Sequence, residues 1–169
     1  GMLTTDDGPV VIAPRSMAAL LAIRRARLLP RVYEGPFLIA QTAARALGDA
    51  LEEPPDWLAV RPAPTDVQWP LPVRLAHCDV LDADTLRLAL SAGASRVLLE
   101  EPTREPAKLS FIRAEGVIAF LVHAYRVGEL TAVGPMIKAL RALGHEDVLP
   151  PPEQLEALHV ALDALEEDG

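Results

Sequence analysis

The stretch over residues 82–101 constrains the fold more than any other part of the chain. Up to Gly93 it carries leucine and alanine at the spacing of one apolar helix face, and glycine commonly ends a helix. Residues 96–99 (RVLL) predict a short buried strand, and Glu100 and Glu101 follow directly. Open α/β folds keep their ligands at the carboxyl edge of the sheet, where these two glutamates would lie. Asp84, in the first turn of the predicted helix, could reach the same edge.

The same order of strand and helix recurs along the chain. Residues 10–13 (VVIA) predict a buried strand that ends at Pro14, and the hydroxyl of Ser16 is suited to cap a helix that extends to Leu28. Residues 37–40 (FLIA) predict a second strand, followed by a small helix over residues 42–51. Because no hairpin signal separates the strands, the pattern predicts a three-layer α/β/α fold with a central parallel sheet.

The segment over residues 52–72 is rich in proline and predicts a long loop with one short strand at 57–60, since proline does not fit helix interiors or central strands. We interpret Trp57 and Trp69 as anchors of this loop to the body, and a ligand platform is the alternative. The later elements are expected in order along the chain: a broken helix over 103–109, a brief strand over 111–113, a strongly apolar helix from 117 to about 128, and amphipathic helices over 131–143 and 153–166.

Length and composition favour one main domain. The chain has 169 residues, half of them apolar, so we expect a domain over residues 2–149 with a carboxyl-terminal helical extension over 150–169 that packs on it or on a partner. The 16 basic and 24 acidic residues give a net charge of −8, which argues against nucleic-acid binding through the overall field and leaves RNA a weak candidate. A lone cysteine, Cys78, and no apolar run long enough for a membrane span lead us to expect a cytoplasmic protein.

Several segments together resemble a known family. These are the acid-containing helix with Asp84, the Gly93-Ala94 pair, the strand that ends in Glu100-Glu101, and residues 116–121 (GVIAFL) followed by Arg126 and Gly128. Their order resembles the carboxyl half of a PIN domain, in a bacterial family of unknown function related to the toxin ribonucleases of toxin–antitoxin pairs. Residues 28–33 (LLPRVY) are similar to a helix end in the amino half of that family.

The resemblance implies a metal site built from carboxylates. PIN nucleases gather three or four of them around Mg²⁺ or Mn²⁺, which activates water and offsets phosphate charge. The family's first acid falls here at Ala13-Pro14 and its second at or near Ala46, neither of which can bind a metal. The resemblance therefore leaves Asp84 and Glu100 as catalytic candidates, with Glu101 beside them as a third candidate metal ligand. The acidic site is degenerate.

Three functions remain open from the sequence. The favoured one is a catalytically impaired PIN-like binding or regulatory module, with a homodimer or an antitoxin-like protein as partner. The second is a Mg²⁺/Mn²⁺-dependent ribonuclease that uses Asp84 and Glu100. The third is a small anion or nucleotide binder at Arg15-Ser16, because an arginine at a helix start favours an anion. Arg15 could instead form a salt bridge to Asp84 or Glu100. A nuclease would also need substitute acids and a basic groove. The acids considered are Asp6, Asp7, Glu105 and Glu115, and the basic residues are Arg24, Arg25, Arg27, Arg31, Arg45 and Arg104.

Overall fold

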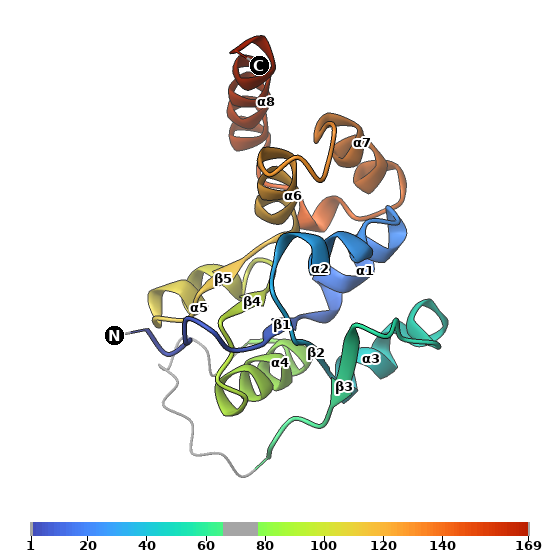
Figure 1. The fold of residues 1–169 in the computed structure, drawn as a ribbon, viewed down its shortest axis with the longest axis vertical. Coiled ribbons are helices and arrows are strands. Elements are labelled where there is room, and N and C mark those ends of the chain that lie inside the picture. The colour runs from blue at the N-terminus through green and yellow to red at the C-terminus, as the bar shows by residue number, and fades with distance from the viewer. Residues whose placement is uncertain (1, 66–77, 169) are drawn as a thin grey trace.

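In the part of the chain that the structure describes, one five-stranded parallel sheet lies between the helices (Figure 1). The computed structural model describes residues 2–65 and 78–168. The strand order is β3-β2-β1-β4-β5 and every neighbouring pair is parallel, which confirms the predicted α/β class. The strands are β1 (Val10–Ile12), β2 (Phe37–Ala40), β3 (Leu58–Arg61), β4 (Arg96–Leu98) and β5 (Ala114–Glu115).

Helices cover both faces of the sheet and make it the middle of three layers. Figure 1 shows α4 on one side of the sheet and α1 with α6 on the other. The helices are α1 (Pro14–Ala22), α2 (Leu29–Val32), α3 (Gln41–Leu47), α4 (Val80–Ser91), α5 (Arg104–Leu109), α6 (Val117–Arg126), α7 (Gly134–Ala142) and α8 (Pro152–Asp168). Short 3-10 turns are η1 (Ala26–Leu28), η2 (Gly48–Leu51) and η4 (Glu146–Val148).

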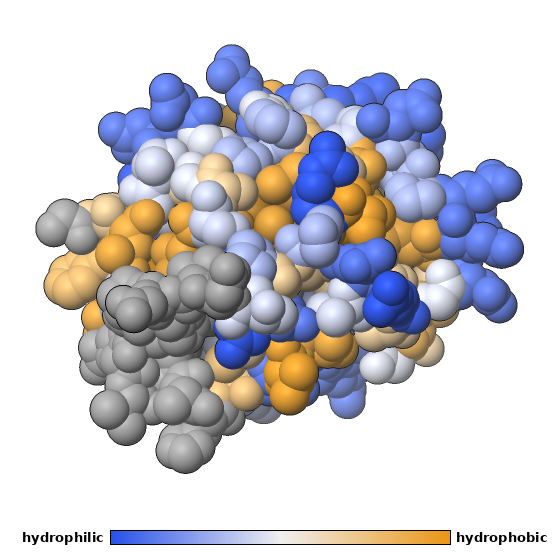
Figure 2. All heavy atoms as spheres, turned by 90° about the horizontal axis from the view of Figure 1, so that it is seen from below, coloured by the Kyte–Doolittle hydropathy of each residue, from blue (hydrophilic) through white to orange (hydrophobic). Residues whose placement is uncertain are grey.

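The core lies on both sides of β1, the central strand, and of its neighbour β4. All three residues of β1 are buried, and so are Val97 and Leu98 of β4, as expected for parallel strands covered on both faces. Phe120 is fully buried on α6, the helix that the sequence predicts to be strongly apolar. Seen from below, the surface carries apolar patches between hydrophilic side chains (Figure 2).

The first helix begins earlier and ends earlier than the sequence predicts. Pro14 occupies its first turn, where the missing N–H costs nothing, and Ala13 rather than Ser16 is the N-cap. The helix stops at Ala22, and Arg24 adopts a left-handed conformation with φ of 58° before the chain continues into η1. The single helix expected up to Leu28 is therefore wrong, and the hydroxyl of Ser16 is left for another partner.

The brief strand predicted over residues 111–113 is also displaced. Phe111 has φ of 66°, a backbone conformation that a strand does not contain, so pairing with β4 starts only at Ala114. The strand predicted inside the proline-rich segment exists as β3, and Trp57 packs edge-on against Phe37 with ring centroids 5.5 Å apart. Trp69 lies outside the described residues.

The last helix packs on the body of its own chain. Leu155 and Leu162 are buried in the main core, and Leu158 packs against that core. They lie three and four residues apart, so they form the one apolar stripe that the sequence predicts for this helix. Among the helices of the described residues, none is both long enough and apolar enough to cross a membrane.

Candidate functional site

The carboxyl edge of the sheet between β1 and β4 is the candidate site. Ile12 pairs with Leu98 in register, so Ala13 and Leu99 leave the sheet side by side. β1 pairs with β2 on its other side, and β4 pairs with β5, so the chain turns away in opposite directions at this point. Parallel α/β proteins bind ligands at such a reversal of strand order. The fold thus brings the start of α1 and the residues after β4 together.

Glu100 is the centre of this edge and is almost completely buried, with 2% of its surface exposed. Its Oε2 accepts hydrogen bonds from Ser16 Oγ at 2.5 Å and from the backbone N–H of Val117 at 3.0 Å. Its Oε1 faces Arg104 Nη1 at 3.3 Å. We call Glu100, Ser16, Arg104 and Val117 the Glu100 cluster. One carboxylate therefore joins the starts of α1, α5 and α6.

Gly116 leaves the space in which this cluster forms. A Cβ atom at this position would collide with Arg104 Nη1 and would lie 2.8 Å from Glu100 Oε1. The backbone of Gly116 is extended, so the requirement is for space and not for an unusual conformation. Gly116 therefore lets the guanidinium of Arg104 approach the buried carboxylate of Glu100.

Burial dominates the electrostatics of Glu100. It raises the pKa of this carboxyl above its ordinary value, because the charged form loses its hydration. The hydrogen bond from Ser16, the charge of Arg104, the N–H of Val117 and the charge of Arg15 act in the opposite direction and lower the pKa. The structure therefore surrounds this carboxylate with protein donors that favour its charged form against the cost of burial.

Asp82, and not Asp84, extends from α4 toward the residues that follow Glu100. Asp82 is 4% exposed, and its Oδ2 accepts a hydrogen bond from Thr103 Oγ1 at 2.7 Å. Burial raises the pKa of Asp82, and the charge of Arg15 acts to lower it. The first turn of this helix lies earlier than the sequence analysis places it. Asp79 is the N-cap, and its Oδ1 accepts hydrogen bonds from the N–H groups of Leu81 and Asp82, so Asp82 lies in the first turn.

Asp84 lies one half-turn further along α4 and contacts other groups. Its Oδ2 accepts a hydrogen bond from Thr42 Oγ1 on α3 at 2.8 Å, and its Oδ1 pairs with Arg87 Nη1 at 3.0 Å. The contacts of Asp84 thus lie with α3, whereas those of Glu100 lie with α1, α5 and α6. The two acids that the sequence pairs as catalytic candidates serve different parts of the fold.

Glu101, the third predicted metal ligand, is half-exposed and is held within its own turn. Its Oε1 pairs with Arg104 Nε at 3.3 Å, and its Oε2 accepts a hydrogen bond from the N–H of Glu105 at 3.2 Å. Arg104 therefore lies between the two consecutive glutamates and offsets the charge of both.

Arg15 and Ser16, the predicted anion site, direct their donors at protein acceptors. Ser16 donates to Glu100, and Arg15 Nη1 donates to the carbonyl oxygen of Glu101 at 2.5 Å. The salt bridge expected from Arg15 to Asp84 or Glu100 is formed instead with Asp147, at 2.9 Å from Nε to Oδ2. Arg15 Nη2 also donates to the carbonyl oxygen of Asp147 at 3.2 Å. Arg15 thereby fastens η4 across the start of α1.

A hollow of about 760 Å³ lies beside the cluster, between α5 and the segment that joins η4 to α8. Besides Glu100, its charged lining residues are positive at Arg104 and Lys108 and negative at Glu101, Glu105, Glu146 and Asp147. Within residues 2–65 and 78–168, no group of three or more His, Cys, Asp or Glu side chains is arranged to hold a metal ion. Chemically, the edge offers a mixed-charge surface around a carboxylate that is already bonded.

A second polar cluster was not identified from the sequence. Tyr33, 8% exposed, donates a hydrogen bond to Glu115, and the guanidinium of Arg96 lies 3.9 Å above the Tyr33 ring and 3.3 Å from Glu115 Oε1. His123 stacks on the same ring, with centroids 5.7 Å apart. We call Tyr33, Arg96, Glu115 and His123 the Tyr33 cluster.

The remaining acids considered as substitutes have other positions. Glu115 belongs to the Tyr33 cluster, and Asp6, whose side chain is exposed on the amino-terminal arm, pairs with Arg113 at 3.6 Å. Asp7 lines a different hollow, near Tyr33 and Ser95. Of these candidates, only Glu105 lines the hollow beside Glu100.

Comparison of the chain with protein-family models, with curated proteins and with solved structures gave no significant match.

Proposed function

We propose that this protein is a PIN-like binding or regulatory module in which the metal-dependent chemistry of the resembled nucleases is impaired. The observation that carries the proposal is the engagement of both Glu100 oxygens. Oε2 accepts from Ser16 and Val117, and Oε1 faces Arg104, while the side chain is buried. A carboxylate whose two oxygens are both engaged by groups of the protein is poorly suited to ligate a metal.

Charge supports the same proposal. In the resembled nucleases a divalent cation would neutralise the acids at this edge, whereas here Arg104 contacts both Glu100 and Glu101. A metal ion would have to approach this guanidinium and displace it, at a Coulombic cost that is largest where water is excluded. The residue directly after β1, where the family's first acid would stand, is Ala13, which is fully buried and has no ligand atom in its side chain.

The proposed module keeps the parallel sheet and the reversal of strand order while its polar groups hold helices together. Ser16, Arg104 and Val117 link three helix starts through Glu100, and Arg15 links η4 to the same edge. Function would then reside in surfaces presented by a rigid edge and not in a reaction at that edge. A protein partner fits the net charge of −8 better than nucleic acid does.

Calorimetric titration with Mn²⁺ tests this proposal on the wild type, on Glu100→Gln and on Asp49→Asn, a matched change at an exposed acid of η2. We expect no micromolar binding in any of the three proteins, and no cleavage of a fluorescent single-stranded RNA in Mn²⁺. Micromolar binding by the wild type and by Asp49→Asn that Glu100→Gln abolishes would overturn the proposal, because it would show that Glu100 is a working metal ligand.

Removal of Arg104 sharpens the test. If this guanidinium occupies the place of a cation, Arg104→Gln should bind Mn²⁺ more tightly than the wild type, since it frees Glu100 Oε1 and Glu101 Oε1 together. Arg113→Gln is the control, because Arg113 pairs with Asp6 on the amino-terminal arm. Equal affinities in the two variants would show that Arg104 does not exclude the metal.

A further inference from the structure

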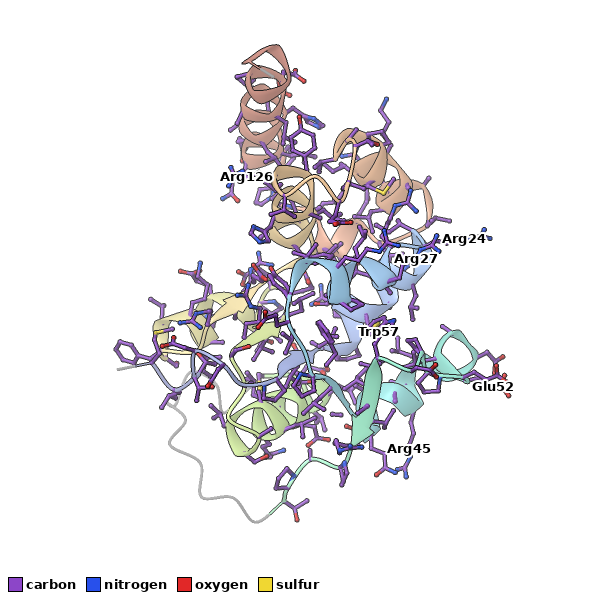
Figure 3. The ribbon with its side chains drawn as sticks, viewed as in Figure 1. Arg24, Arg27, Arg45, Glu52, Trp57 and Arg126 are labelled. Carbon is purple, nitrogen blue, oxygen red and sulfur yellow. The ribbon has the colours of Figure 1, made fainter. Side chains whose placement is uncertain are left out.

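A mostly apolar groove lies at the end of α1, away from the Glu100 cluster. It has a volume of about 370 Å³, and Leu21, Ala26, Pro55 and Trp57 form its apolar lining. Its other lining residues are charged: Arg24, Arg27 and Glu53. Figure 3 shows Arg24 and Arg27 side by side at the end of α1, with Trp57 on the neighbouring part of the chain. The groove thus combines an apolar lining that includes one indole ring with two guanidinium groups.

The two arginines of this groove differ from most others in the protein. Both are exposed, and within the described residues no ion pair joins either of them to an acid. The arginines with acidic partners are Arg15, Arg31, Arg87, Arg96, Arg104, Arg113 and Arg141. In a chain with a net charge of −8, Arg24 and Arg27 therefore form a local basic site beside an apolar surface.

The outer face of α8 has the complementary character. Leu155 and Leu162 hold one side of this helix in the core, whereas Val160 is 62% exposed. Glu156 and Asp163 lie one turn before and one turn after Val160, so they share its face, and both are exposed. Val160 is thus an apolar side chain between two carboxylates. Figure 1 shows α8 projecting from the rest of the molecule, with its end free of other elements.

We propose that α8 of a second copy of this chain docks in the groove, with Val160 against Trp57 and with Glu156 and Asp163 beside Arg24 and Arg27. The charge pattern selects this occupant, since an acidic helix face with one apolar side chain matches an apolar groove whose lining carries two arginines against one glutamate. The buried leucines keep the inner side of α8 on its own body, which leaves the outer face for another molecule. A dimer with two-fold symmetry makes the contact twice.

The groove fits a helix better than it fits a nucleic acid. Its floor is formed by aliphatic, proline and indole groups, which offer few hydrogen bonds to base edges. The overall negative charge also repels a phosphate backbone, whereas between two copies the basic groove and the acidic helix attract locally and set the orientation. This inference is independent of whether the Glu100 cluster retains metal chemistry.

Sedimentation equilibrium of the full chain over a range of concentrations tests the proposal. We expect a dimer that Val160→Glu weakens at least about tenfold, and that Arg24→Glu with Arg27→Glu weakens to a similar extent. Val80→Glu, which changes a more exposed valine on α4, and Arg45→Glu, which changes an exposed arginine on α3, are the matched controls and should leave the dimer unchanged.

A charge exchange separates the proposed contact from damage to the fold. The Arg24→Glu/Arg27→Glu protein and the Glu156→Arg/Asp163→Arg protein should each self-associate at least about tenfold more weakly than the wild type, and an equimolar mixture should recover a heterodimer, because each groove then meets a helix of opposite charge. A monomeric wild type, a wild-type dimer that resists both groove and helix changes, or a mixture that does not associate would overturn the proposal. A further result would also overturn the proposal: the wild type binds single-stranded RNA, the Arg24→Glu/Arg27→Glu protein does not, and Val160→Glu leaves self-association unchanged.

Discussion

The Glu100 cluster and the Tyr33 cluster use the same kinds of group at different depths. Each contains a carboxylate, a guanidinium and a hydroxyl. The Glu100 side chain is 1% exposed and its partner Arg104 is 26% exposed, whereas Glu115 and Arg96 are 24% and 29% exposed. In the first cluster the carboxylate is buried together with Ser16 and Val117, and in the second the buried member is the phenol of Tyr33.

The two clusters differ in which ionisable group loses hydration on burial: the Glu100 carboxyl in one and the Tyr33 phenol in the other. In the Glu100 cluster burial raises the pKa of the carboxyl, and the surrounding donors act against that rise. In the Tyr33 cluster burial raises the pKa of the phenol, and the neighbouring charge of Glu115 raises it further. The phenol of Tyr33 stays neutral, so its burial costs no charge hydration. The charged form of Glu100 loses its hydration on burial and is stabilised only by its hydrogen-bond donors and the neighbouring arginines. The Glu100 cluster should therefore be the less tolerant of change.

Truncation of the two carboxylates should show the largest difference. Glu100→Ala leaves the Ser16 hydroxyl and the Val117 N–H buried without an acceptor and removes a partner of Arg104, so we expect a loss of about 3 to 5 kcal/mol in the free energy of unfolding. Glu115→Ala should cost about 1 to 2 kcal/mol, because Arg96 is partly exposed and can turn to water. Urea unfolding of both variants measures the difference, and equal losses would contradict it.

Addition of one methyl group beside Glu100 should have a smaller effect. Gly116→Ala places a Cβ against Arg104 Nη1 and Glu100 Oε1, so Arg104 must move away, and we expect a loss of about 1 to 3 kcal/mol. Gly134→Ala is the control at the start of α7, where a Cβ meets nothing within 4 Å. It should stay within about 0.5 kcal/mol of the wild type in thermal or urea unfolding. An unchanged free energy of unfolding in Gly116→Ala would show that the contact between Arg104 and Glu100 does not stabilise the fold.

Titration of Glu100 should give the smallest effect, because it adds or removes one proton and deletes no heavy atom. The folded-state pKa of Glu100 is raised, so between the ordinary glutamate value of about 4.3 and the higher folded value the native state keeps a proton that the unfolded chain releases. Glu100 therefore makes its full contribution to the free energy of unfolding at a pH below the ordinary glutamate pKa. That contribution decreases as the pH rises through the folded-state pKa.

Urea unfolding of the wild type and of Glu100→Gln across the same pH range isolates this contribution. The glutamine does not titrate, so the wild-type free energy of unfolding minus that of Glu100→Gln should decrease as the pH rises. The other acids titrate in both proteins and cancel in the difference. A difference that increases with pH would mean that the donors around Glu100 outweigh its burial.

The candidate site was only partly predictable. The sequence placed Glu100 at the carboxyl edge, because an apolar run that ends in acids marks the end of a buried strand. It named Asp84 and did not consider Asp82, although Asp82 lies in the first turn of the observed helix, and two residues along a helix turn a side chain to another face. It also missed the Tyr33 cluster, whose members come from four separate segments of the chain.

By itself the sequence determined the α/β class, the positions of β1, β2 and β4, and the apolar stripe of α8, because these follow from patterns that repeat within one element. Only the tertiary structure decided which donors meet each acid. Arg15 pairs with Asp147, 132 residues away, and Ser16 bonds Glu100, 84 residues away. Such pairs are set by how helices pack across the sheet, and no local periodicity records that packing.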